Sequence, residues 1–229
     1  MSAFVSVVIP VRNGVRYLGE AIESVLRQGR GDIEAIVVDN GSSDGSQSLA
    51  ASFGAPVRVI DEPQRGAAHA RNTGARLACG EYLAFLDADD VWAPGKLARQ
   101  LTELEARKDL DMVFTYGENF LSPELTETQR RAVSFAPGVG PFIIPSAMLT
   151  RRESFVRVGP FPDLREGEFI AWYGLALSMG MRSEVIPEAL LLRRVHLTNS
   201  TRLEGRPGDL LRAAKMVLDH RRNSKGPAS

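Results

Sequence analysis

The sequence predicts an α/β fold of three layers, in which helices cover both faces of a mixed, mainly parallel sheet. Short runs of β-branched and other apolar residues alternate with stretches whose apolar residues recur every three or four positions. This βαβαβαβ alternation occupies the first 86 residues and has short connections, which is typical of parallel strands joined by crossover helices. Ligands of such sheets bind beyond the carboxyl ends of the strands, so functional residues are expected there.

Each element of this pattern is marked by its own residues. Continuous apolar runs predict four buried strands, at residues 5–9, 33–38, 57–60 and 82–86. Amphipathic stretches between these runs predict helices at residues 17–28, 47–53 and 67–78. The rest of the chain is expected to form helices at 94–107, 152–158, 166–179 and 209–220, and ordered or extended segments at 112–116, 147–150, 182–186 and 190–195.

Residues 121–142 interrupt the regular pattern. They contain three prolines and two glycines without a clear period, which predicts a long loop or lid. A chain of 229 residues is of the right length for one domain. We therefore expect a single domain with a first half at residues 1–117, a second half at 118–205, and a C-terminal amphipathic helix and tail at 206–229.

The composition is that of an ordinary globular protein, with 44% apolar and 24% charged residues, which argues against disorder, collagen and coiled coil. The 28 basic and 28 acidic residues cancel, so no nucleic-acid partner is expected. A single cysteine, Cys79, cannot form an internal disulfide, which favours a reducing, cytoplasmic location. No apolar run is long enough to span a membrane, and no export signal is recognised at the amino end.

Acidic residues follow the predicted strands. If the strands are parallel, their carboxyl ends bring residues 10–13, residues 39–44, Asp61 and residues 87–90 to one edge of the sheet. Carboxylates that gather there repel one another unless a cation such as Mg²⁺ or Mn²⁺ neutralises them, and these ions often bridge one or two carboxylates to substrate phosphates. The alternative is that the aspartates form turns and cap helices.

Four blocks in the first 90 residues resemble the signature blocks of the family 2 glycosyltransferases, in order and in spacing. The blocks are VSVVIPVRN at 5–13, VVDNGSSDG at 37–45, ARNTG at 70–74 and GEYLAFLDADD at 80–90. The resemblance weakens after Trp92 and returns over residues 152–196. It implies a GT-A fold, a UDP- or dTDP-linked sugar as the donor, a divalent metal and inversion at the anomeric carbon.

The resemblance also implies roles for individual residues. Asp39 would contact the nucleobase, Arg71 would lie near the base and phosphates, and Asp87 would contact the ribose. Asn40 stands where the family commonly has an aspartate, and keeps a hydrogen-bonding group without the charge. The metal would be held by Asp89 and His196. The full donor-binding set is Pro10, Val11, Arg12, Asn13, Asp39, Asn40, Arg71, Asp87, Ala88, Asp89 and His196.

The catalytic base is the point at which the sequence departs from the family. The base is usually the aspartate of a Glu-Asp pair that opens a helix, and this chain has Glu168 followed by Phe169. Phenylalanine cannot accept a proton, so Glu168 is the expected base, with Glu166 and Asp163 as further candidates. The alternative for Glu168 is a carboxylate that only stabilises a helix N-terminus.

Three other functions are alternatives to a glycosyltransferase. Phe169 favours a protein that binds nucleotide sugars without turnover. A haloacid-dehalogenase-type phosphatase fits the apolar strand and Asp-x-Asp at 82–91, but that family places its nucleophile after the first strand, and here the motif follows the fourth. A sugar nucleotidyltransferase would need a basic, glycine-rich loop after the first strand, and residues 11–16 are too short and contain one glycine.

The C-terminal region is locally basic. Its basic residues are Arg202, Arg206, Arg212, Lys215, Arg221, Arg222 and Lys225, against Glu204, Asp209 and Asp219. This pattern is consistent with a peripheral contact to an anionic membrane surface beside a lipid-linked acceptor. The alternative is a solvated helix that packs on the domain or on a second subunit in a homodimer. The acceptor could be a saccharide, a lipid-linked group or a peptide.

Overall fold

The computed structural model describes residues 4–29, 32–133, 136–197 and 207–224. Within these residues one nine-stranded sheet runs in the order β3-β2-β1-β4-β8-β6-β9-β5, and β7 pairs with the middle of β6. The strands are β1 (Val5–Val11), β2 (Ile33–Asp39), β3 (Val57–Asp61), β4 (Tyr82–Phe85), β5 (Val91–Trp92), β6 (Met112–Leu121), β7 (Val139–Phe142), β8 (Leu149–Arg151) and β9 (Ser183–Val195). The helices are α1 (Val15–Leu26), α2 (Ser46–Ser52), α3 (Ala67–Leu77), α4 (Lys96–Ala106), α5 (Glu127–Ala132), α6 (Arg152–Val158), α7 (Glu168–Ser178) and α8 (Pro207–Ser224), and a 3₁₀ turn spans Pro145–Ala147.

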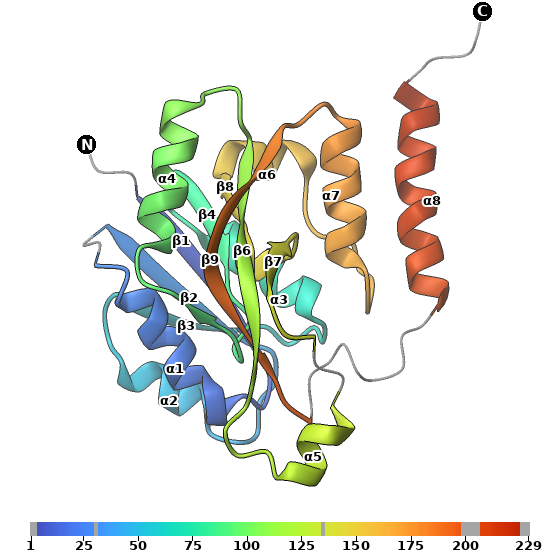
Figure 1. Cartoon of the computed structure of the whole chain (residues 1–229). Helices are drawn as coiled ribbons and strands as arrows, with labels where there is room; N and C mark the ends of the chain where they lie inside the picture. Colours follow the sequence, from blue (N-terminus) through green and yellow to red (C-terminus); the bar gives the residue numbers. More distant parts are fainter. Residues whose placement is uncertain (1–3, 30–31, 134–135, 198–206, 225–229) are drawn as a thin grey trace, which may run out of the picture.

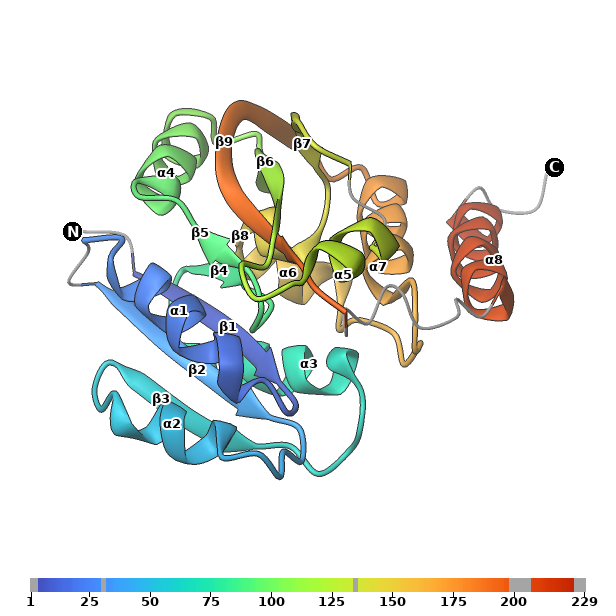
Figure 2. The ribbon, with the colours of Figure 1, turned by 60° about the horizontal axis from the view of Figure 1, so that its bottom comes forward.

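The first four strands are parallel, and the predicted three-layer α/β fold is confirmed. The chain moves outward from β1 to β2 and β3, and then crosses back to place β4 on the other side of β1. Helices α1 and α2 lie on one face of the sheet and α3 on the other (Figures 1 and 2). This reversal of strand order between β1 and β4 is the point at which open α/β sheets bind their ligands.

Burial explains why these segments form the predicted elements. Every residue of β2 and β4 is buried, as expected for strands that are covered on both faces. Helix α1 buries Leu18, Ile22 and Val25 on the side that faces the sheet. A Cβ at Gly74 would lie 2.3 Å from Cγ1 of Val8, so glycine is what lets α3 approach β1 this closely.

The second half is more regular than the sequence predicts. The loop predicted at residues 121–142 is wrong in part, because α5 and β7 form inside it, and β7 pairs antiparallel with β6. The strand predicted at 112–116 continues to Leu121 and crosses the predicted boundary between the halves at residue 117. The two extended segments predicted at 182–186 and 190–195 are one strand, β9, which pairs with β6 through an irregular register near Tyr116.

Helix α8 packs on the outer side of α7 (Figure 1). Ala213 of α8 is buried, and Nδ1 of His220 lies 2.9 Å from Oγ of Ser178 on α7. Arg202, Arg206 and Lys225, which contribute to the basic tail, lie outside the described residues. Among the described helices, none is long and apolar enough to cross a membrane. The predicted membrane contact and homodimer stay predictions.

Candidate functional site

The carboxyl ends of the parallel strands meet at one edge, as the sequence predicts. Val11 at the end of β1 is in register with Asp39 at the end of β2, and Asp39 is in register with Asp61 of β3. On the other side of β1, the backbone N–H of Leu86 donates to the carbonyl of Val8, which brings the residues after β4 to the same edge. The edge therefore gathers carboxylates from several strands that are distant in sequence.

Side chains join the turn after β1 to the turn after β2. Asn13, in a left-handed conformation with φ 52°, accepts a hydrogen bond from the N–H of Ser43 at 2.8 Å, and its own N–H donates to Oγ of Ser42. Oδ2 of Asp44 accepts from the N–H of Val15 at 2.9 Å, while its Oδ1 accepts from the N–H of Ser46 at 3.0 Å. Asp44 is thus a capping residue for α1 and α2, as the turn-and-cap alternative predicts for some of these aspartates.

Replacing Asp44 with asparagine is expected to lower the free energy of unfolding by about 1 kcal/mol at neutral pH, because the amide has one acceptor oxygen where the carboxylate uses two. Burial opposes ionisation of Asp44, but hydrogen bonds from Ser46 and Val15 outweigh it and lower its pKa. A carboxyl with a lowered folded-state pKa stabilises the protein above its unfolded pKa of about 4, and this contribution is lost as the pH falls through the folded value. Urea unfolding should therefore separate wild type from Asp44→Asn at neutral pH, and the two curves should converge in acid. A gap that persists in acid would contradict this account.

Asn40 and Asp39 differ in how the protein uses their polar atoms. Nδ2 of Asn40 donates to the carbonyls of Glu62 and Gln64, each at 2.8 Å, and its Oδ1 accepts from the N–H of Gly66. An aspartate could not donate these two bonds, so the amide holds the β3–α3 loop and leaves no N–H for a ligand. Oδ2 of Asp39 accepts from the N–H of Ser42, whereas its Oδ1 is buried and has no hydrogen-bond partner among the residues that the structure describes.

Arg71 joins the first aspartate of the Asp-x-Asp sequence to Glu168. Its Nη2 donates to Oδ1 of Asp87 at 2.6 Å, and its Nη1 donates to Oε1 of Glu168 at 2.7 Å. The arginine side chain is only 7% exposed. Burial opposes its charge, but the two carboxylates outweigh burial and raise the pKa of Arg71 above its ordinary value. The buried cation thereby joins a carboxylate that follows β4 to a carboxylate at the start of α7.

Glu168 and Phe169 face different surroundings. Phe169 is 6% exposed and packs in the core, where its ring lies 5.9 Å from that of Tyr173 and 6.2 Å from that of Trp172. Position 169 therefore points away from the sheet edge, and Glu168 at the start of α7 is the one directed at Arg71. Within the described residues, Oε2 of Glu168 makes no hydrogen bond. Of the other candidates, Asp163 pairs with His69 at 3.0 Å and is largely exposed.

Asp89 and His196 lie together at the edge. Nε2 of His196, which follows β9, is 2.9 Å from Oδ2 of Asp89, and the histidine is 6% exposed. Asp90, which follows Asp89 in the sequence, is buried and accepts a hydrogen bond from the N–H of Arg194 at 3.1 Å. Burial and the charges of Asp89 and Asp87 raise the pKa of Asp90 well above its ordinary value. The repulsion expected among clustered carboxylates is therefore present in this turn.

The residues present fit a divalent metal that completes its coordination with substrate oxygens. Among the described residues, no three His, Cys, Asp or Glu side chains form a group able to hold a metal by themselves. Asp89 and His196 would contribute a carboxylate oxygen and an imidazole nitrogen, which lie 2.9 Å apart and are both ligand types that divalent ions accept. Magnesium typically binds one or two protein groups together with substrate phosphates and water.

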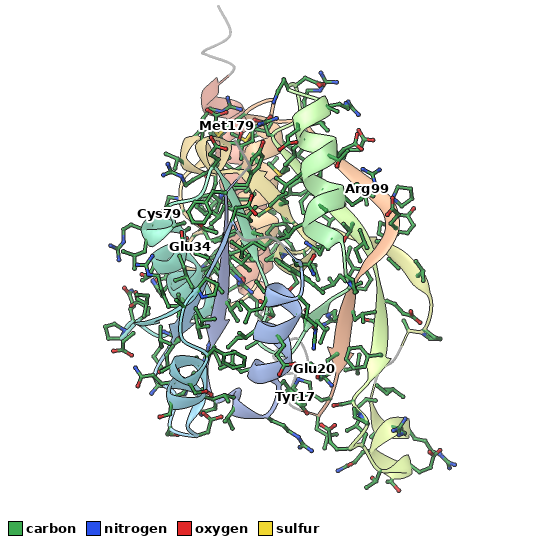
Figure 3. The ribbon with its side chains drawn as sticks, turned by 90° about the vertical axis from the view of Figure 1, so that its left-hand side faces the viewer. Tyr17, Glu20, Glu34, Cys79, Arg99 and Met179 are labelled. Carbon is green, nitrogen blue, oxygen red and sulfur yellow. The ribbon has the colours of Figure 1, made fainter. Side chains whose placement is uncertain are left out.

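Several residues around His196 have no signal in the sequence. Tyr17 and Glu20 lie on α1 beside the end of β9 (Figure 3). The Tyr17 ring is 4.8 Å from the imidazole of His196, and Glu20 forms an ion pair with Arg194. Ser146 of the 3₁₀ turn accepts from the N–H of Asp87 at 3.1 Å. These contacts join segments that are distant in the chain, so no local pattern could have revealed them.

Comparison with known proteins places the chain among glycosyltransferases. The model of the family described as "Glycosyl transferase family 2" matches residues 6–159. The glycosyltransferase GlyG of Streptococcus pneumoniae is 32% identical over 181 residues, which cover 69% of this chain and 60% of GlyG. The chain thus spans less than two thirds of GlyG, and only 36% of some other curated relatives.

Solved structures agree with the fold. S. aureus TarS (residues 1–349), in complex with UDP-GlcNAc, superposes with a TM-score of 0.79 at 18% identity, over 95% of this chain and 66% of that one. The mannosyltransferase PcManGT from Pyrobaculum calidifontis, in complex with GDP-Man and Mn²⁺, gives a TM-score of 0.65 at 21% identity, over 100% of this chain and 77% of that one. The GT-A fold expected from the four sequence blocks is confirmed. Because the family model matches well over half of the residues, the chain belongs to glycosyltransferase family 2.

Proposed function

We propose that the protein transfers a sugar from a uridine- or thymidine-diphosphate sugar to an acceptor hydroxyl, with inversion at the anomeric carbon. Asp39 would bind the nucleobase, Asp87 the ribose, and Asp89 with His196 the Mg²⁺ or Mn²⁺ that accompanies the diphosphate. The turn at residues 10–13, with Ala88, would complete the cradle for the nucleoside. Two solved structures with a similar fold, TarS in complex with UDP-GlcNAc and PcManGT in complex with GDP-Man and Mn²⁺, support a nucleotide-sugar donor.

The observation that carries this proposal is Oδ1 of Asp39, which is buried near the point where strand order reverses and finds no hydrogen-bond partner in the described part of the chain. A buried acceptor without a donor costs about 1–3 kcal/mol, which a ligand N–H can recover. Uracil and thymine present an imide N–H on their pairing edge, and cytosine presents an acceptor at the same position. The site should therefore favour uridine or thymidine nucleotides over cytidine nucleotides.

In the proposed reaction, the acceptor oxygen bonds to the anomeric carbon as the bond from that carbon to the diphosphate oxygen breaks. The proton of the acceptor hydroxyl passes to Oε2 of Glu168. Arg71 holds Oε1 of the same carboxylate, and its second amino group holds Asp87, so base and donor site keep a fixed separation. A bound Mg²⁺ or Mn²⁺ supplies positive charge that stabilises the leaving diphosphate.

The test is calorimetry of UDP, dTDP, GDP and CDP, each with and without Mn²⁺. We expect UDP and dTDP to bind more tightly than CDP, and Mn²⁺ to strengthen binding.

Asp39→Asn should weaken UDP binding about tenfold. The amide oxygen is expected to stay with the N–H of Ser42, which turns the NH₂ group toward the base, so CDP should gain affinity. Asp61→Asn, on an exposed carboxylate in register with Asp39, is the matched control. If Asp39→Asn binds UDP as tightly as the wild type does, Asp39 does not bind the nucleobase. If Mn²⁺ does not affect nucleotide binding by the wild type, the protein is not a metal-dependent transferase.

A second function is binding of nucleotide sugars without turnover. It is supported by Phe169, which replaces the family's base and packs in the core, and by the ion pair that occupies Oε1 of Glu168. Release of UDP from a panel of UDP-sugars separates the two functions. Tight binding without any release of UDP, with saccharide, lipid-linked or peptide acceptors present, would favour the binding protein.

A further inference from the structure

A chain of contacts connects the segment after β6 to His196. Tyr17 on α1 donates its hydroxyl hydrogen to Oε1 of Glu124, which lies between β6 and α5. The other oxygen of Glu124 accepts from the hydroxyl of Ser122, a fully buried residue whose backbone N–H donates to the carbonyl of Val195 at 3.0 Å. Glu124 is therefore held between α1 and the end of β9.

The ring of Tyr17 lies at the centre of this arrangement. One neighbour is the imidazole of His196, at 4.8 Å between ring centroids. Another is the guanidinium of Arg194, whose central carbon lies 4.7 Å from the Tyr17 ring and 4.6 Å from the ring of Phe120. Nε of Arg194 donates to the carbonyl of Asp89 at 3.0 Å. Tyr17 thus borders Arg194, on β9, and His196, just after β9, and both of these residues contact the Asp-x-Asp turn.

The charge states at neutral pH support this hydrogen bond. Burial opposes ionisation of Glu124, but hydrogen bonds from Ser122 and Tyr17 outweigh it and lower its pKa to about 2. Burial and the bond to Glu124 raise the pKa of Tyr17. The pair is therefore a neutral phenol that donates to a carboxylate, and such charge-assisted bonds are stronger than neutral ones.

We propose that Tyr17 and Glu124 are positioning residues that hold the imidazole of His196 against Asp89. The inference rests on the proposed function, in which His196 and Asp89 face the metal and diphosphate. In this proposal both residues act through His196 and not on the reacting atoms. Glu124 fixes the phenol, the phenol ring limits the rotation of the imidazole, and Nε2 of His196 then stays at Asp89. The pair also ties the start of the segment at residues 121–142 to the donor site.

The experiment compares Tyr17→Phe, which keeps the ring and loses the hydroxyl, with Glu124→Ala, which removes the acceptor. Removing groups that orient metal ligands typically costs 10- to 100-fold in metal affinity. We expect either variant to weaken Mn²⁺-dependent UDP binding about tenfold and to leave metal-free UDP binding unchanged. The double variant should lose no more than Glu124→Ala alone, because without the carboxylate the Tyr17 hydroxyl has lost the acceptor to which it donates.

The control is Tyr82→Phe. Tyr82 is the first residue of β4, at the end of that strand away from the Asp-x-Asp turn, and its hydroxyl lies 3.4 Å from Nη1 of Arg151. It should leave both affinities unchanged. A purely structural role of the pair predicts lower stability with unaltered affinities, and this outcome would overturn the inference, as would additive losses in the double variant.

A second readout does not depend on nucleotide binding. In the ligand-free protein, Tyr17→Phe should move the imidazole NMR resonances of His196 and leave those of His69 and His220 in place. If the wild type fails to bind nucleotide but these resonances move, the proposed function fails and the coupling stands. If the His196 resonances do not move, the coupling fails whatever the nucleotide data show.

Discussion

Replacing Glu168 with glutamine is expected to lower the rate of sugar transfer by about a hundred- to ten-thousand-fold, the range typical of a lost general base. Nucleotide affinity should change little, because the glutamine oxygen can still accept from Nη1 of Arg71. The measurement is the rate of UDP release from the donor sugar that the wild type turns over, at saturating donor. A fall in turnover with unchanged affinity separates a base from a residue that only shapes the site.

Glu166→Gln and Asp163→Asn are matched controls for this substitution. Both carboxylates lie in the same loop before α7, and Asp163 is engaged with His69. Both controls should keep the wild-type rate. If Glu168→Gln keeps that rate and one control loses it, the proton passes to that other carboxylate. If no substitution changes the rate, none of the three is the base.

The substitution Arg71→Met is expected to lower the free energy of unfolding by about 3 kcal/mol. Removing one partner of a buried ion pair typically costs about 3–5 kcal/mol, because the opposite charge stays buried without compensation. Here two carboxylates are left, and the value is at the lower end because the Asp87 side chain is 35% exposed. Urea unfolding measures the change.

Arg76→Met is the control, since Arg76 is exposed on the same helix, α3. Arg71→Lys tests the geometry, because an ammonium keeps the charge but lacks the planar fork that reaches both carboxylates. We expect Arg71→Lys to fall between the wild type and Arg71→Met. Equal stability of Arg71→Met and Arg76→Met would show that the bridge contributes nothing to folding.

The parallel half of the fold was predictable because its information is local. The apolar runs and amphipathic stretches of the first 86 residues give strands and helices in the predicted order, and short crossover connections leave few topologies. Residues 121–142 were predicted less well. Their prolines and glycines indicate a loop, but pairing with β6 stabilises β7 regardless of local preference.

The candidate site likewise contains residues that the sequence predicts and residues whose roles depend on the fold. Asp39, Asp87 and Asp89 follow strand ends, so a sequence pattern finds them. The tasks of Asp44 and Asn40 depend on which backbone groups the neighbouring turns present, and a sequence does not contain those positions. The direction of Phe169 likewise depends on the aromatic core that α7 meets.

The family and the sheet edge were predictable from sequence alone, because strand ends and motif spacing are properties of short segments; the nucleotide- and metal-binding residues stay predictions. Which of these side chains contact one another became clear only from the folded chain. Arg71 reaches Glu168 across 97 positions and His196 reaches Asp89 across 107, while Tyr17 meets Glu124 across another 107. Such contacts depend on how helices pack on the sheet, and packing is set by the whole core at once.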